Sequence, residues 1–188
     1  MFKKIADNRE QDSVAVQFRK RRFAFFVSLL SSLEQPVRIL DIGGAENFWR
    51  MMGAIDEDQI HVTLLNLSQE SVTLPNMKSV AGDARQTEFA AQSFDVVFSN
   101  SVIEHVGAYA DQQRMAEEAR RVGKRYFIQT PNKYFPLEPH FLFPFYQFLP
   151  ISIRVWLLRN FNLGWIPKTP DAAKARKTVT SIRLLESV

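Results

Sequence analysis

The sequence predicts an α/β protein built around a mostly parallel sheet. Short, nearly continuous apolar runs, typical of strands buried on both faces, alternate with segments of helical periodicity. Apolar residues make up 46% of the chain and charged residues 23%, the balance of a soluble globular protein. In such a sheet, ligands bind outside the carboxyl ends of the strands. The residues at these ends are therefore the first candidates for a functional site.

Five strands and three helices are expected. The strands are predicted at residues 37–42, 61–67, 78–81, 94–99 and 125–129, and residues 178–185 are a candidate sixth strand. The helices are predicted at residues 13–33, 45–53 and 110–122. In the first helix, Phe18, Phe25, Leu29 and Leu33 recur near helical spacing, and Phe26 and Leu30 widen this apolar stripe. Gly123 suits the left-handed position that ends the third helix.

Composition excludes several kinds of chemistry. The chain has no cysteine, which rules out disulfides, cysteine-ligated metals and a cysteine nucleophile, and favours a cytoplasmic location. Its three histidines lack a clustered spacing, so no metal site is expected. The polar stretch at residues 7–12 argues against a signal peptide, and no apolar run reaches transmembrane length.

The net charge of +4 is concentrated in residues 19–22 and in the segment that follows residue 167. Such clusters can meet phosphates or an anionic membrane surface, or can simply be a solvated helix face and a mobile tail. Peripheral membrane contact is therefore one expectation. A nucleic-acid substrate is disfavoured, since Thr130-Pro131-Asn132-Lys133 does not resemble an Asn/Asp-Pro-Pro-Tyr catalytic motif.

The first strand ends in Asp41-Ile42-Gly43-Gly44-Ala45, a glycine turn that lets a ligand approach the backbone. The dinucleotide fingerprint G-x-G-x-x-G fails, because Ala45 and Phe48 occupy its second and third glycine positions. An acidic residue just before the turn is unfavourable beside a pyrophosphate. Asp41 instead suits a ligand that carries positive charge and an amino-acid moiety.

Four motifs in residues 37–132 together resemble the class I S-adenosylmethionine-dependent methyltransferases, most closely the small-molecule group called type 11. They are the glycine turn, Leu64-Leu65-Asn66-Leu67-Ser68, Ala81-Gly82-Asp83-Ala84 and the run from Ser93 to Val106. The resemblance implies a Rossmann-like three-layer sandwich and S-adenosyl-L-methionine as the cofactor. The family usually has seven strands, so the final strands are expected to be missing and the domain to be shortened at its C-terminus.

The resemblance also implies which residues bind the cofactor. The glycine turn would lie under the methionine part, Asn66 and Leu67 beside the ribose, and Asp83 and Ala84 around the adenine. The cofactor-binding residues expected in this way are Asp41, Gly43, Gly44, Ala45, Asn66, Leu67, Asp83, Ala84, Asn100 and Ser101. The chain departs from the family at Ala45, usually glycine, and at Asn66, usually acidic, which predicts weaker binding.

His105 is the candidate catalytic base, because its side chain titrates near neutral pH and it follows the fourth strand. It could equally cap or pack the start of the next helix. Glu104 could orient His105 or serve as a first-turn acid of that helix. Beyond the fifth strand, Asn132 and His140 are candidates to bind the substrate, whereas His140 could also be a loop histidine satisfied by backbone.

The chain is expected to form a single methyltransferase domain spanning residues 1–188. Its parts are an N-terminal helix at 13–36, a cofactor-binding core at 37–132, a substrate or lid segment at 133–166 and a basic tail at 167–188. Aromatic residues gather in 134–166, where a lid or membrane-facing helix competes with a core-covering helix pair. A small-molecule acceptor is expected, and it would be lipid- or quinone-like if this segment meets a membrane. A catalytically impaired scaffold that binds S-adenosylmethionine is the alternative.

Overall fold

A computed structural model describes residues 14–53 and 58–186 of the chain. These residues form two compact units. The first runs from Lys20 to Thr130, and the second comprises the described residues outside that range, chiefly 131–186. Each unit has its own hydrophobic core, and the predicted strands all lie in the first.

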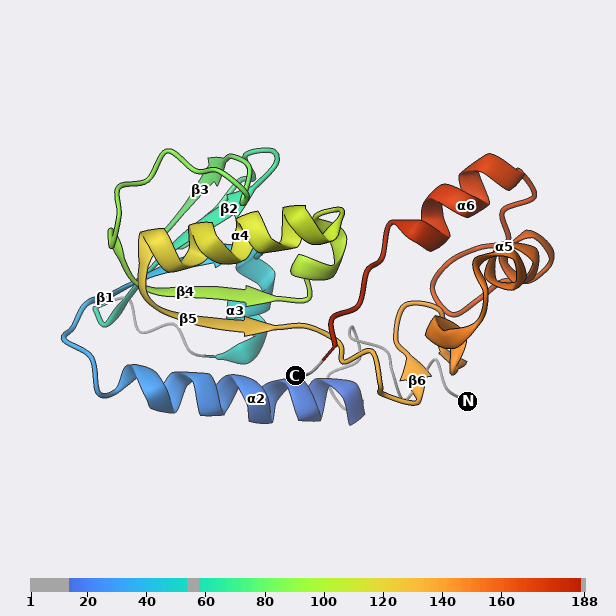
Figure 1. The fold of residues 1–188 in the computed structure, drawn as a ribbon. Coiled ribbons are helices and arrows are strands. Elements are labelled where there is room, and N and C mark those ends of the chain that lie inside the picture. Colours follow the sequence, from blue (N-terminus) through green and yellow to red (C-terminus); the bar gives the residue numbers. More distant parts are fainter. Residues whose placement is uncertain (1–13, 54–57, 187–188) are drawn as a thin grey trace. The chain divides into compact units, whose positions relative to one another are not determined.

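The first unit is built on a five-stranded sheet in the order β3-β2-β1-β4-β5, with every neighbouring pair parallel (Figure 1). The strands are β1 (Val37–Ile42), β2 (Ile60–Asn66), β3 (Met77–Ala81), β4 (Phe94–Asn100) and β5 (Gly123–Gln129). The predicted fold class is confirmed, with strand starts that differ from expectation by at most two residues. Among the described residues the sheet has five strands, with β3 and β5 at its edges.

One face of the sheet is covered by α2 (Val14–Leu30) and α3 (Glu46–Met52) through an aromatic cluster. Phe26 of α2 lies 4.7 Å from Phe98 of β4 between ring centroids, and Phe23 meets Trp49 edge-on at 5.4 Å. Such pairs add about 0.5 to 1.5 kcal/mol each beyond the area that they bury. The cluster fastens both helices to the centre of the sheet.

The predicted apolar stripe of α2 is confirmed only in part. Phe18, Phe25 and Leu29 are exposed, whereas the buried set consists of Phe26 and Leu30, which the stripe included, and Phe23, which it did not. Both sets recur at helical spacing, so periodicity alone does not choose between them. The choice is made by packing, because only the second set meets the aromatic side chains of α3 and β4.

The opposite face is covered by α4 (Tyr109–Val122), which buries Met115, Ala119 and Val122 as predicted (Figure 1). Gly123 does not adopt the left-handed conformation expected of it. It is extended, at φ −104° and ψ 142°, and begins β5 directly. A Cβ at this position would lie 2.6 Å from the Val97 side chain. The glycine is therefore required for close packing between the end of α4 and β4.

The connections at residues 67–76 and 82–93 contain no helix and are held by side chains of neighbouring elements. The Glu46 carboxylate, in the first turn of α3, accepts hydrogen bonds from the Thr73 backbone (2.5 Å), the Thr73 hydroxyl (2.7 Å) and Arg50. These bonds lower the pKa of Glu46 to about 2. The first loop is thereby tied to α3 just beyond the glycine turn.

At the amino ends of the strands, Asp95 of β4 joins β1 and β5. Its carboxylate accepts hydrogen bonds from the backbone N–H of Arg38 (2.9 Å), from the Arg38 guanidinium and from Lys124 (2.8 Å). Burial alone would raise the pKa of Asp95, but these hydrogen bonds outweigh it and lower the pKa below its usual range. Asp95 is thus a structural residue, far along the strands from their carboxyl ends.

The second unit contains a two-stranded antiparallel ribbon, β6 (Leu137–Glu138) with β7 (Phe143–Pro144), followed by α5 (Ile151–Asn160) and α6 (Ala172–Thr180). Short 3-10 helices occur at η2 (Tyr146–Phe148) in this unit and at η1 (Ile103–His105) in the first. The buried core of the second unit consists of Phe141, Tyr146, Leu158, Leu163, Ala175 and Val179. No described helix is both long enough and apolar enough to cross a membrane.

The candidate strand at 178–185 is not formed, because its first residues belong to α6. Asp171 caps this helix by accepting a hydrogen bond from the Lys174 N–H at 2.6 Å. The alanines, lysines and arginine that follow favour helix strongly enough to extend it through Thr180. Of the predicted strand, only Leu185 makes a β-bridge, with Asn132.

Candidate functional site

The turn after β1 brings backbone groups to the solvent at the carboxyl end of the sheet. Gly43 has φ +73°, a left-handed conformation that favours glycine, and its N–H donates to the Leu65 carbonyl at 2.8 Å. A Cβ on Gly43 would lie 2.4 Å from Cγ2 of Val102. Gly43 and Ala45 are exposed. Ala45 is extended, so its methyl group causes no backbone strain.

Asp41 lies directly beneath this turn. Its side chain is 1% exposed, and one carboxylate oxygen accepts a hydrogen bond from the Trp49 indole at 2.7 Å. A Cβ on Gly44 would lie 1.8 Å from the same oxygen, so only glycine leaves room for the carboxylate. Burial raises the pKa of Asp41 to about 7, although the hydrogen bond from Trp49 acts in the opposite direction. The buried group is thus poised to change charge near neutral pH.

Asn66 ends β2 and reaches back to the glycine turn. Its Nδ2 donates a hydrogen bond to the Gly44 carbonyl at 2.9 Å, and its own carbonyl accepts from the Gly82 N–H at 2.8 Å. An aspartate could not make the first bond, because a carboxylate has no donor. Asn66 therefore links the ends of β1, β2 and β3 and keeps a side-chain oxygen as an acceptor. The next residue, Leu67, is 85% exposed.

Asp83 follows β3 and is held by Arg85. The Arg85 guanidinium donates to both Asp83 oxygens, and the Arg85 backbone N–H donates to Oδ1 at 2.9 Å. These hydrogen bonds lower the pKa of Asp83. Arg85 also donates to Asp111 at 2.9 Å, and Asp111 in turn accepts from the Ala108 N–H at the start of α4. The carboxylate is therefore fixed in place, with its side chain 39% exposed, while Ala84 is half-buried.

The end of β4 turns sharply over the glycine turn. Ser99 is fully buried and its hydroxyl donates to the Ile42 carbonyl at 3.2 Å. Asn100 is half-buried, and Ser101 is exposed with φ +61°. A left-handed conformation costs a residue other than glycine about 1 to 2 kcal/mol. Residues with such strained backbone cluster at functional sites. Here the strained residue is followed by Val102, whose side chain lies against Gly43.

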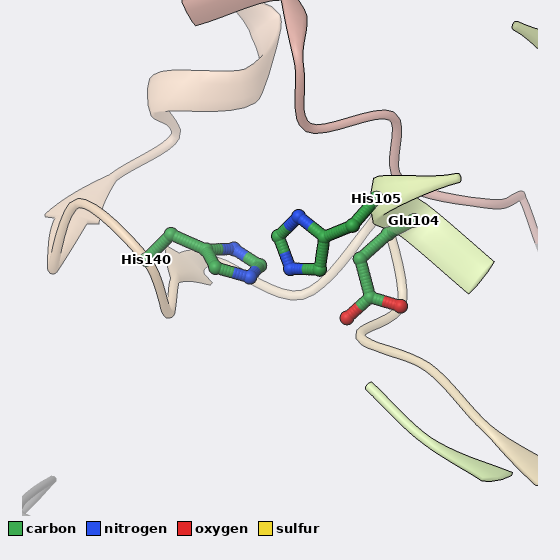
Figure 2. Close-up of side chains that lie close together, drawn as sticks. All are labelled: Glu104, His105 and His140. Atoms are coloured by element: carbon green, nitrogen blue, oxygen red, sulfur yellow. The ribbon is translucent and has the colours of Figure 1, made fainter. Parts of the chain in front are cut away.

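Glu104 and His105 follow on η1, and their side chains leave it in different directions (Figure 2). Glu104 is fully buried and accepts a hydrogen bond from the Thr130 hydroxyl at 3.0 Å. Glu104 thus lies in the first turn of η1, as considered from the sequence, but its carboxyl group is internal. His105 is exposed, and its backbone N–H donates to the Val102 carbonyl.

Asn132 and His140, the predicted substrate-side residues, belong to the second unit. The Asn132 side chain accepts a hydrogen bond from the Tyr134 N–H at 2.8 Å. His140, which Figure 2 also draws, has its Nδ1 2.7 Å from the carboxylate of Glu138. Glu138 is 2% exposed and accepts a second bond from the Phe141 N–H. This carboxylate orients the His140 ring through Nδ1, so that Nε2 is the ring nitrogen that does not face Glu138.

Three residues that hold site carboxyl groups by hydrogen bonds were not predicted from the sequence: Trp49, Arg85 and Thr130. Arg85 carries a readable signal, because an arginine two residues after an aspartate suits a turn closed by the aspartate side chain. Trp49 and Thr130 carry none, since their partners Asp41 and Glu104 are fixed only by tertiary packing.

Two cavities of the first unit lie away from these residues. One, of about 520 Å³, lies beside β3 and is lined by Gln69, Lys78 and neighbouring residues. The other, of about 570 Å³, lies at the amino ends of the strands and includes Arg38 and His61. Neither is lined by Asp41, Asn66 or Asp83. The candidate site is instead a rim at the carboxyl ends of the strands, formed by Asp41, Gly43, Gly44, Asn66 and Asp83. The parallel register aligns these strand ends, and the hydrogen bonds of Asn66 connect them.

Residues 40–126 match the family model described as a methyltransferase domain. This segment runs from β1 into β5 and contains the glycine turn, Asn66, Asp83 and His105. Together with the parallel sheet order 3-2-1-4-5, the match identifies it as a methyltransferase domain of the class I, S-adenosylmethionine-dependent type. The identification made from the sequence motifs is confirmed.

Solved structures share this fold at low sequence identity. A candidate methyltransferase of an antibiotic biosynthesis pathway from Anabaena variabilis is 19% identical, with a TM-score of 0.52 over 76% of this chain and 61% of its own. A candidate methyltransferase from Bacillus halodurans is 17% identical, with a TM-score of 0.50 over 85% of this chain and 68% of its own. The [4+2]-cyclase SpnF is 16% identical, with a TM-score of 0.50 over 84% and 55%.

The chain thus spans about three fifths of the length of the Anabaena protein. No curated protein shows a significant match. Because one of the shared folds belongs to a protein described as a cyclase, the fold alone does not define a reaction. The reaction therefore depends on the chemistry of the residues at the rim.

The rim residues fit S-adenosylmethionine, the cofactor of this family. A buried carboxyl group with a pKa of about 7 lies beneath an exposed glycine turn, where a positively charged amino-acid moiety would stabilise its ionised form. Asn66 offers an amide oxygen for a hydroxyl donor, and Asp83 offers a carboxylate held in place by Arg85.

Proposed function

We propose that the chain transfers a methyl group from S-adenosyl-L-methionine to a small-molecule acceptor, and that its cofactor-binding site is the rim formed by Asp41, Gly43, Gly44, Asn66 and Asp83. The observation that carries this proposal is the buried Asp41 carboxyl group under Gly44. A buried acid with a raised pKa is costly to ionise, and a bound cation offsets that cost.

Each residue has a defined part in this proposal. The bound cofactor supplies a methyl group on a positively charged sulfur. Asp41 balances positive charge beneath the glycine turn, Asn66 accepts a hydrogen bond from a ribose hydroxyl, and Asp83 accepts one from the adenine amino group. Asn100 and Ser101, at the strained end of β4, complete the wall of the site. The protein thus aligns the reactants, which is its main contribution to an in-line displacement.

His105 is proposed as the base that takes a proton from the acceptor. It is exposed at the carboxyl end of β4, where the residues before it approach the glycine turn. The predictions that Asn132 and His140 contact the acceptor stay predictions. A lipid- or quinone-like acceptor is part of the proposal, supported by the aromatic residues of the second unit. So is a cytoplasmic location with contact to the membrane surface.

The proposal is tested first by binding. Isothermal titration with S-adenosylhomocysteine should give saturable binding to the wild-type chain, and the melting temperature should rise with ligand concentration. Asp83→Ala should weaken this binding. If millimolar ligand neither gives heat nor shifts the melting temperature, the cofactor site is disproved.

Transfer is tested with S-adenosylmethionine that carries a labelled methyl group, incubated with an organic-solvent extract or with an aqueous metabolite extract. Label appearing in the organic phase supports a lipid- or quinone-like acceptor, whereas label in the aqueous phase assigns a polar one. His105→Ala should lower turnover by about 10² to 10⁴ while leaving the affinity for S-adenosylhomocysteine unchanged. An unchanged rate would remove His105 from the reaction.

A binding scaffold without catalysis is the second candidate, and Asn66 favours it. Its amide is engaged with Gly44 and offers a neutral acceptor where the family has a carboxylate, which weakens recognition of the ribose. A scaffold would bind S-adenosylhomocysteine but release no labelled product from either extract.

A further inference from the structure

The second unit carries the positive charge of this protein. Residues 131–188 contain eight lysines and arginines and three acidic residues, a net charge of +5, whereas the whole chain carries +4. The preceding 130 residues are therefore close to neutral. Charge gathered in one segment attracts an anionic partner, and the attraction grows with each exposed cation.

Large apolar side chains are exposed on the same unit. Trp156 is 56% exposed, Phe161 50%, Trp165 44% and Ile153 44%. Trp156 and Phe161 pack edge-on at 5.8 Å, so they form one apolar surface instead of scattered residues. Single exposed hydrophobic residues need no explanation, but an aromatic cluster beside cations indicates a binding surface.

The helix α5 carries large apolar side chains on two opposite sides. Leu158 is fully buried against the core of the second unit, with Val155 packed beside it. Ile153 and Trp156, three residues apart, share the side that points away from Leu158. A surface helix normally turns a polar face outward. The outer side of α5 instead exposes two large apolar side chains between the polar residues Ser152 and Asn160.

Arg159 lies one helical turn after Trp156, beside the outer side of α5, and other cations are exposed on the neighbouring helix. Arg159 is exposed on α5, where its Nε donates to the Pro170 carbonyl at 2.9 Å. The helix α6 packs against α5 and exposes Lys174, Arg176 and Lys177. Tryptophan, phenylalanine and isoleucine flanked by lysine and arginine are the combination that lies in the interface of an anionic bilayer, with the rings at the headgroup level.

We propose that the second unit docks on anionic phospholipid bilayers through the outer side of α5, with Ile153, Trp156 and Phe161 entering the interface and the cations of α5 and α6 contacting lipid phosphates. With ten residues, α5 is too short to cross a bilayer, so on a membrane it would lie in the plane of the interface. A nucleic acid would use the charge but would leave Ile153 without a partner. This inference deepens the membrane contact that is part of the proposed function, but it does not depend on methyl transfer.

The test is co-sedimentation of the full chain with vesicles of phosphatidylcholine alone or mixed with phosphatidylserine. The chain should sediment with the mixed vesicles, and added salt should release it. Trp156→Glu should lower the partition coefficient by roughly tenfold or more. Tyr109→Glu is the matched control, because Tyr109 is 62% exposed in the first unit, and it should leave partitioning unchanged.

The charge requirement is tested separately. Lys174→Gln combined with Lys177→Gln should lower partitioning by roughly one order of magnitude, and Lys78→Gln, at an exposed position of β3, should not. Circular dichroism establishes that each variant is folded, and titration with S-adenosylhomocysteine should give the wild-type affinity throughout. This readout separates a failure of docking from a failure of the proposed function.

Three outcomes would overturn the proposal. The first is no sedimentation with phosphatidylserine vesicles, and the second is binding that Trp156→Glu leaves unchanged. The third is another occupant of the same surface. Binding of a single-stranded oligonucleotide without vesicle binding would assign the surface to nucleic acid, and a dimer that Trp156→Glu dissociates would assign it to a second copy of the chain.

Discussion

Asp41 is the residue whose environment most directly links structure to ligand binding. Its carboxyl group is buried and hydrogen-bonded to the Trp49 indole, and burial raises its pKa to about 7. Below that pH the free protein holds the group neutral. A ligand that brings positive charge to the glycine turn favours the ionised form, so binding should release the proton.

We therefore expect the affinity for S-adenosylmethionine to rise between about pH 5 and pH 7 and to level off above. The Asp41→Asn variant should lack this rise, because an amide does not titrate in the range. Isothermal titration in buffers of different ionisation enthalpy measures the proton release directly. Equal release by wild type and variant would contradict the assignment of the linked proton to Asp41.

Gly44 makes a second residue-scale prediction. A Cβ there would lie 1.8 Å from an Asp41 oxygen, so Gly44→Ala must displace the carboxylate or the turn. Overpacking of this kind costs about 1 to 3 kcal/mol, and the affinity for S-adenosylhomocysteine should fall as well. Urea denaturation and isothermal titration measure the two effects.

Gly53 supplies the matched control for that variant. It has φ +71° at the end of α3 and nothing within 4 Å of the built Cβ. Gly53→Ala should cost about 1 to 2 kcal/mol through backbone strain alone and leave ligand affinity unchanged. Equal losses of affinity in both variants would show that Gly44 has no special relation to the site.

Between elements, Arg85 connects the loop after β3 to the first turn of α4. It donates hydrogen bonds to Asp83 and Asp111, and the side chain is 38% exposed. Partly exposed pairs contribute little to stability, about 0 to 1 kcal/mol. Their effect on binding is larger, because a carboxylate fixed in advance loses less entropy when a ligand arrives.

Arg85→Ala should therefore weaken binding of S-adenosylhomocysteine by roughly tenfold with little change in melting temperature. Arg114→Ala is the comparison, since Arg114 donates to Asp111 at 2.6 Å and acts on Asp83 only through a charge–charge interaction weaker than that of Arg85. Its affinity should stay at the wild-type value. Tighter binding in Arg85→Ala would mean that Arg85 competes with the ligand for Asp83 instead of positioning it.

The elements that sequence predicted best are those that a single pattern specifies. Each strand of the sheet is an apolar run bounded by turn residues, and each was located within two residues. The buried face of α2 was predicted only in part, because exposed and buried apolar residues share its periodicity. Residues 178–185 were read as a strand because β-branched residues there obscured the helix-forming residues before them. Tertiary packing determines which face of α2 is buried, and extension of α6 determines the structure of residues 178–180. Neither effect can be inferred from a short stretch of sequence.

The candidate site likewise has a part that a sequence pattern specifies and a part that only tertiary packing specifies. The order of motifs along the chain placed Asp41, Asn66 and Asp83 at one end of the sheet, since parallel strands in register align their carboxyl ends. The partners of these residues could not be inferred, because Trp49 and Arg85 act through contacts that only the folded chain creates. Sequence thus identifies the groups that face a ligand more readily than those that hold them.

At the scale of the whole molecule, two kinds of carboxyl group have opposite effects on how stability changes with pH: those with a lowered pKa and one, Asp41, with a raised pKa. Hydrogen bonds from neighbouring groups lower the pKa values of Glu46, Asp111 and Glu118 to about 2, and those from Arg38 and Lys124 outweigh burial to lower that of Asp95. The stability that these four carboxylates contribute is fully present above about pH 4, their usual range when unfolded, and is lost as the pH falls toward 2.

Asp41 has the opposite sign, because its pKa is raised to about 7. Between about pH 4 and pH 7 the unfolded chain has released this proton while the folded chain retains it, so stability falls as the pH rises, by a few kcal/mol at most. The melting temperature should therefore pass through a maximum near pH 4 to 5 and decline toward neutral pH. In Asp41→Asn the decline should be largely absent, whereas the loss at low pH should remain because Asp95 and its partners are untouched. Thermal unfolding by circular dichroism across this range measures both limbs, and a wild-type melting temperature that climbs steadily up to pH 8 would show that the buried carboxyl group does not titrate as the structure requires.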